Sequence, residues 1–174
     1  MAEMVKRLRW LFLVSVFLVL TSCGKMTQSN HTLTVTLVFN PNIVRQGQTI
    51  HGFLVVNNPG PPIDMERDEV GFRCVPLFDV GLSGNGIPRQ GSTFPLDCQA
   101  TPYSIRHGVT RLPTYVSASY STCTENPSDA SLSRPNCNGN RLPALPPGTF
   151  MASVLWSTKV PLPAPPPVPI VVTH

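Results

Sequence analysis

Charged side chains are scarce in this 174-residue sequence, in which Lys and Arg together number 13 and Asp and Glu together number 9. Proline, by contrast, occurs 20 times. Proline interrupts helices, and long charged residues are among the good helix formers, so this composition disfavours an all-α fold. After Cys23, no segment keeps the 3.6-residue apolar period of an amphipathic helix over about ten residues. The sequence therefore predicts a fold built from strands.

No apolar run reaches the roughly 18 to 20 residues that a membrane-spanning helix needs. The longest apolar segment occupies only residues 10–20, and the basic residues Lys6, Arg7 and Arg9 precede it. A basic start followed by about 7–15 apolar residues is typical of a secretory signal peptide. The sequence therefore predicts an exported chain without a spanning helix.

The apolar segment ends at a cysteine. Leu20 is followed by the small residues Thr21 and Ser22 and then by Cys23. This stretch resembles the lipobox of bacterial lipoproteins. The resemblance implies that the Cys23 thiol receives a diacylglyceryl group, with acyl chains such as palmitate, and that cleavage before Cys23 removes residues 1–22.

Two acyl chains are enough for stable membrane anchoring. The expected location is therefore the extracytoplasmic face of a bacterial membrane, with the membrane contacted through diacylglyceryl-Cys23. The alternative is a plain signal peptide with an incidental cysteine.

Four cysteines follow Cys23, and an even number in an exported chain predicts two disulfides. Several pairings are possible, and we favour the sequential one, in which each bond closes a modest loop and contributes roughly 3 kcal/mol by the chain-entropy model. The sequence has no Cys-x-x-Cys motif and no histidine at ligand spacing from a cysteine, so metal ligation is the weaker alternative and no cofactor is expected. The predicted pairs are Cys74 with Cys98 and Cys123 with Cys137.

Apolar and polar residues alternate in several segments, as in half-buried strands. The expected apolar faces are Leu33, Val35, Leu37 and Phe39; Val116, Ala118 and Tyr120; and Phe150, Ala152, Val154 and Trp156. A further strand is expected within 49–58, with Ile50, Phe53 and Val55 as its apolar face and a bulge near Gly52. Turn-rich segments separate about six to eight such strands, which favours an antiparallel sandwich.

The alternating strands of residues 32–58, and the passage from LPPGTF into the closing VPIVVTH, resemble the first and last strand pairs of bacterial immunoglobulin-like domains. The resemblance spans roughly residues 32–173 and lacks the Cys–Trp–Cys spacing of antibody domains. It implies an all-β fold with a single antiparallel immunoglobulin-like β-sandwich over residues 32–174, joined to the membrane by the tether 23–31.

Few side chains suggest chemistry. The four histidines are scattered without metal-ligand spacing: His31, His51, His107 and His174. A carboxylate cluster lies among two arginines, which favours a solvated loop over a cation or acid–base site: Asp64, Glu66, Asp68 and Glu69. Four aromatic residues could line a ligand surface or pack as core and cross-strand pairs: Tyr103, Tyr115, Tyr120 and Trp156. The sequence contains no basic stripe with interleaved aromatic residues, so nucleic-acid binding is not expected.

These observations favour a non-catalytic binding or interaction module at the cell envelope. Its expected partner is an envelope protein or a glycan, reached through end loops or exposed strand edges. The alternatives are an envelope hydrolase, a protease inhibitor that uses loop 83–92 or loop 123–137, and an accessory subunit of a larger envelope complex. Sequence spacing alone does not separate these alternatives.

Overall fold

The computed structural model describes residues 32–65, 77–91, 103–158 and 162–174. All of them belong to one compact unit, Thr32–His174. These residues contain ten β-strands and a single turn of 3-10 helix, Pro127–Asp129. The all-β fold expected from the sequence is confirmed, with more strands than expected because several have only three or four residues.

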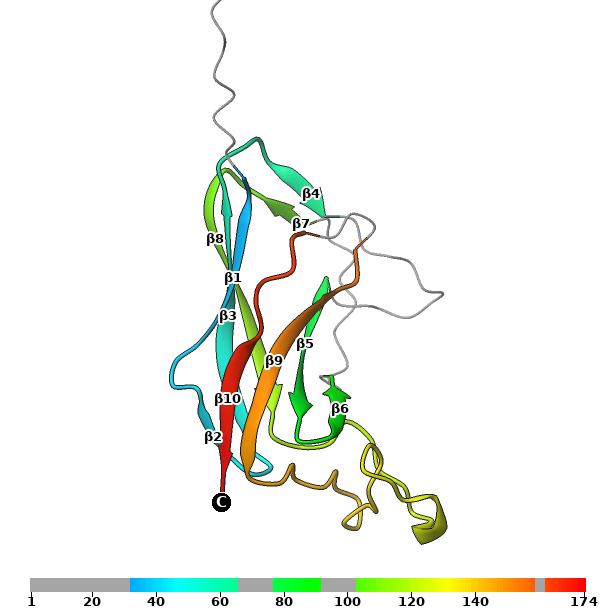
Figure 1. Ribbon diagram of the computed structural model, residues 1–174. Coiled ribbons are helices and arrows are strands. Elements are labelled where there is room, and N and C mark those ends of the chain that lie inside the picture. Colours follow the sequence, from blue (N-terminus) through cyan, green and yellow to red (C-terminus); the bar gives the residue numbers. More distant parts are fainter. Residues whose placement is uncertain (1–31, 66–76, 92–102, 159–161) are drawn as a thin grey trace, which may run out of the picture. The chain divides into compact units, whose positions relative to one another are not determined.

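The first sheet has three antiparallel strands in the order β1-β3-β8 (Figure 1). Its central strand β3 pairs with β8 over all ten of its residues. The bounds of the three strands are Thr34–Phe39 for β1, Thr49–Asn58 for β3 and Gly108–Ser117 for β8.

The second sheet has five strands in the order β2-β10-β9-β5-β6. All its neighbours are antiparallel except β2 and β10, which pair in parallel. The chain therefore leaves the first sheet after β1 and enters the second at β2. The bounds are Ile43–Arg45, Val168–Thr173, Gly148–Trp156, Phe78–Gly84 and Ile87–Gln90, in sheet order. Two short strands, β4 (Ile63–Met65) and β7 (Tyr103–Ile105), form a separate antiparallel pair.

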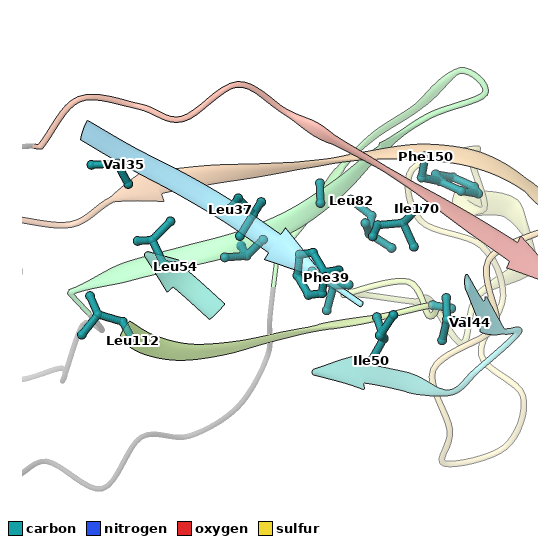
Figure 2. Close-up of a cluster of buried hydrophobic side chains, with 14 of the residues drawn as sticks. Val35, Leu37, Phe39, Val44, Ile50, Leu54, Leu82, Leu112, Phe150 and Ile170 are labelled. Atoms are coloured by element: carbon teal, nitrogen blue, oxygen red, sulfur yellow. The ribbon is translucent and has the colours of Figure 1, made fainter. Parts of the chain in front are cut away.

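Inward side chains of both larger sheets form one hydrophobic cluster. Figure 2 shows Leu37 and Leu54 of the first sheet together with Leu82, Phe150 and Ile170 of the second. Leu54, Phe150 and Ile170 have no exposed surface. Burial of such side chains is the main favourable contribution to folding, at about 25 cal/mol per Å² of apolar surface.

The expected alternation is confirmed in three strands. Val35, Leu37 and Phe39 of β1 are buried, and so are Val116, Ala118 and Tyr120 in and just after β8. On β9, Phe150 and Ala152 are buried, whereas Val154 and Trp156 are partly buried against the core.

The expected apolar face of β3 is wrong in two of its three residues. Ile50 points inward with Leu54 and Val56, but Phe53 and Val55 occupy the opposite face. The expected bulge near Gly52 is absent, because β3 pairs with β1 and β8 without a shift of register.

Gly52 instead makes room in the core. It lies opposite Phe39 of β1, and a Cβ at this position would lie 2.5 Å from Cδ1 of the Phe39 ring and would also meet the Val38 carbonyl oxygen. The missing side chain therefore allows the Phe39 ring to pack against the β3 backbone. The break in alternation marks this close approach and not a bulge.

A buried amide closes the end of β3. Asn58 is 2% exposed, and its side chain donates to the Pro61 carbonyl at 2.8 Å and accepts from the Gly60 amide at 3.0 Å. It also lies 3.3 Å from the Ile105 carbonyl. One side chain thus joins the β3–β4 turn to the end of β7.

We expect Asn58→Ala to lower the free energy of unfolding by about 1–3 kcal/mol, because it leaves buried backbone groups without partners. Urea unfolding followed by circular dichroism measures the change. The matched control is Asn57→Ala, since Asn57 is the exposed neighbour on the opposite face, and its effect should stay within about 0.5 kcal/mol. Equal unfolding midpoints for both variants would contradict the role given to Asn58.

Candidate binding surface

The structure describes only one of the two predicted disulfides. Cys123 and Cys137 are bonded, with their Cα atoms 5.0 Å apart, as the sequential pairing predicts. Cys74 and Cys98 lie outside the described residues, and so does the predicted lipidation site Cys23. No helix in the described part of the chain is long and apolar enough to cross a membrane.

The histidines and carboxylates singled out in the sequence do not come together in the described residues. His51 lies on the exposed side of β3, His107 Nδ1 bonds to the Gly60 carbonyl at 3.1 Å, and His174 is exposed at the last position. Of the carboxylate cluster only Asp64, in β4, is among the described residues. Glu66, Asp68 and Glu69 lie outside the described residues, and so does His31. Within the described ranges, no group of three or more His, Cys, Asp or Glu residues could hold a metal ion.

The outward face of the first sheet carries a row of apolar side chains, one from each strand. Val38 of β1 lies opposite Phe53 of β3, and Phe53 lies opposite Pro113 of β8. Val38 is 40% exposed and Phe53 is 48% exposed. Residues directly opposite one another on a sheet face have Cβ atoms about 4.5–5.5 Å apart, so the three side chains are neighbours.

Two more rings and two valines extend this row along the strands. His51 and Tyr115 form the next cross-strand pair, with ring centroids 6.2 Å apart at an interplanar angle of 57°. On the other side of Phe53, Val55 is partly exposed and Val109 is 65% exposed. We call these residues the outer patch: Val38, His51, Phe53, Val55, Val109, Pro113 and Tyr115.

Polar side chains border the outer patch. Thr36 and Arg111 flank Val55, and hydroxyl or amide groups occupy both ends of the face, at Thr34 and Asn57 and at Thr49 and Ser117. None of the outward positions of β1, β3 and β8 is a carboxylate, and Arg111 is their permanently charged side chain. The face is thus apolar in its centre and slightly basic, and both ends carry polar groups, with Val109 as the apolar neighbour of Asn57 at one of them.

The outward face of the second sheet differs in kind. Ile43 lies beside Val171, and Met151 lies beside Pro169, which gives an aliphatic cluster without an aromatic ring. Leu155 is 57% exposed and lies opposite Asp79, whose carboxylate pairs with Arg89 at 2.9 Å. Leu155 is therefore an exposed apolar strand residue outside the outer patch.

Of the four aromatic residues singled out in the sequence, only Tyr115 belongs to the outer patch. Tyr120 is buried, and Tyr103 and Trp156 pack against the core. Trp156 meets Phe78 edge to face, with ring centroids 5.6 Å apart. Phe53 was missed, because the sequence pattern assigns it to the core.

The loop between Cys123 and Cys137 is held by its own hydrogen bonds. Thr124 N donates to the Pro135 carbonyl, and Cys137 N donates to the Thr124 carbonyl, both at 2.9 Å. At its tip, Ser131 and Arg134 exchange two backbone hydrogen bonds of 2.9 and 3.1 Å. The tip is therefore a closed tight turn.

Comparisons with known proteins do not assign this chain to a family. No protein-family model matches the sequence, and no curated protein matches it significantly. Among solved structures, the Pseudomonas fluorescens alkylpurine DNA glycosylase AlkC, bound to DNA containing an abasic site analog, has a TM-score of 0.43 and 10% sequence identity over 82% of this chain. The chain spans 30% of that glycosylase chain.

We expect the double variant Cys123→Ala/Cys137→Ala to unfold at lower urea concentration, with a loss of about 3 kcal/mol, because the bond closes a loop with a sequence separation of 14. Limited proteolysis with subtilisin, mapped by mass spectrometry, should then show new cuts within residues 124–136. Substitution is preferable to reduction, since reduction also acts on the other cysteines. An uncut loop and an unchanged unfolding midpoint would contradict a stabilising role for this bond.

Proposed function

We propose that this protein is a lipid-anchored, non-catalytic binding module of the bacterial cell envelope and that the outer patch is its binding surface. The observation that carries the proposal is the row formed by Val38, Phe53 and Pro113, with Phe53 48% exposed in the middle of a sheet. Contiguous exposed apolar groups rimmed by polar side chains are typical of interaction sites.

The chemistry of the patch supports binding. An exposed phenylalanine leaves apolar surface in contact with water, which costs a free energy of about 25 cal/mol per Å². A ligand that covers the ring recovers this free energy. Aromatic side chains also dominate the energetics of many interfaces. Because Phe53 lies on the central strand, with β1 and β8 paired on either side, its position is fixed before a ligand arrives. Little ordering entropy is then lost on binding.

The face is a better candidate than the adjoining β8 edge. A partner strand that adds to a sheet edge depends on main-chain hydrogen bonds. Pro113 lies within the edge strand β8 and has no backbone N–H, and proline of this kind is one of the features that protect edge strands from pairing.

The proposed architecture is a single immunoglobulin-like β-sandwich. The passage of the chain from one sheet to the other between β1 and β2 supports it, as does the parallel pairing of β2 with the last strand. The shared hydrophobic cluster supports it as well. In such a sandwich each sheet keeps one face for the core and offers the other to solvent.

Protease inhibition is a weaker alternative. An inhibitor that imitates a substrate presents an extended segment to the protease cleft. The two backbone hydrogen bonds between Ser131 and Arg134 instead curl the tip of the disulfide-closed loop into a tight turn.

The proposed anchor has a direct test. Cells grown with an alkyne-labelled palmitate should incorporate the label into the wild-type chain but not into Cys23→Ala, because the thiol is the proposed site of acylation. In-gel fluorescence of the captured protein measures the label. The double variant Cys123→Ala/Cys137→Ala is the control and should stay labelled. Label that persists in Cys23→Ala would refute anchoring at this residue.

The proposed binding surface is tested with the full chain, purified in detergent micelles and immobilised for biolayer interferometry against solubilised envelope material from the producing cells. We expect Phe53→Thr to weaken binding about tenfold, because it removes the central ring, while threonine is itself favoured in strands. Leu155→Thr removes a similarly exposed apolar strand residue from the second sheet and should bind like the wild type. An equal loss of binding in both variants, or no loss in either, would mean that the binding site is not the outer patch.

A further inference from the structure

We infer that the ligand of the outer patch is an extended polysaccharide strand that bears acidic groups and lies along β3 and β8. This inference rests on the proposed function and names the chemistry of the partner. Three properties of the face carry it: its dimensions, the order of its apolar and polar groups, and its charge.

The dimensions fit a polymer better than a second folded protein. β3 and β8 each have ten residues, so the face is about 33 Å long at about 3.3 Å per residue. Three strands spaced about 4.8 Å apart make it about 10–14 Å wide, which gives roughly 300–500 Å². A stable complex between two proteins buries about 800 Å² on each partner. A single extended strand is the ligand that a long, narrow face of this size accommodates.

The order of side chains along the face fits a sugar. A sugar ring presents C–H groups on its flat faces and hydroxyl groups around its rim. The outer patch offers the rings of Phe53, Pro113 and Tyr115 for the C–H faces. Hydroxyl and amide side chains that can bond to sugar hydroxyls lie at both ends of the same face: Thr34 and Asn57 at one end, Thr49 and Ser117 at the other.

The charge of the face points to an acidic chain. Arg111 lies in the same cross-strand row as Val55, next to the row of Phe53, and is exposed. A guanidinium binds carboxylate or phosphate through two parallel hydrogen bonds. Since the outward positions of β1, β3 and β8 include no carboxylate, no acidic side chain on this face opposes the approach of an anion.

The experiment uses polysaccharide purified from the envelope of the producing cells and freed of protein with proteinase K. The full chain in detergent micelles is run in native gels cast with or without this polysaccharide. We expect retardation that disappears when the polysaccharide is first cleaved with periodate. The apparent affinity should fall about tenfold in Phe53→Thr and about tenfold in Arg111→Gln. Two variants serve as matched controls and should migrate like the wild type: Leu155→Thr for the apolar residue and Arg141→Gln for an exposed arginine outside the face.

The outcomes separate this inference from the proposed function. Equal loss in Arg111→Gln and Arg141→Gln, with no effect of Phe53→Thr, would mean attraction of a polyanion by net charge and would overturn the inference. Absence of retardation overturns it too. If Phe53→Thr still loses binding to whole envelope material and proteinase K destroys that binding, the ligand is a protein and the proposed function stands. If neither material binds, both fail.

Discussion

Strand β3 is buried on one face only, and the register of its side chains determines both sides of the first sheet. Successive side chains on a strand point to opposite faces, so a slip of one residue would exchange the two sets. Leu54 is fully buried, and this fixes Phe53 on the outside. The pairing of β3 with both neighbours is continuous, so Val38 and Pro113 follow Phe53 to the same face. The free energy that holds the outer patch in place therefore comes from the core beneath it.

The sequence predicts some strands well and others poorly, for a physical reason. The segments that form β1 and β9 have apolar residues mainly on one face, so their alternation can be recognised in the sequence. In β8 the alternation is clear only towards its end, where Val116 is followed by the buried residues Ala118 and Tyr120. β3 has apolar residues on both faces and a glycine between them. The space above Gly52 is used by the ring of Phe39, a residue of another strand, and local alternation contains no information about this contact. The strands of three or four residues are likewise defined by partners distant in the chain.

The candidate surface was only partly predictable. Tyr115 is among the aromatic residues that the sequence offers for a ligand surface, and the bond between Cys123 and Cys137 is the one that the favoured sequential pairing predicts. Phe53 was assigned to the core, because an aromatic residue in an apolar strand is usually buried. The row of Val38, Phe53 and Pro113 joins three segments of the chain, so it exists only once the register of both strand pairs is known. Anchoring at Cys23 remains a prediction from sequence alone.

The parallel pairing of β2 with β10 has a consequence for the order in which the chain can fold. Asn42 bonds to the carbonyl of Pro169, a residue 127 positions later, and Val171 N donates to the Asn42 carbonyl. A chain that emerges from its N-terminus can pair β1 with β3 early, because only residues 40–48, which include β2, separate them. β2 must wait for the last strand, and contacts between such distant residues form slowly. Until Val168–Thr173 has emerged, β2 lacks its partner strand, and Val44, which is buried in the folded protein, stays exposed to solvent.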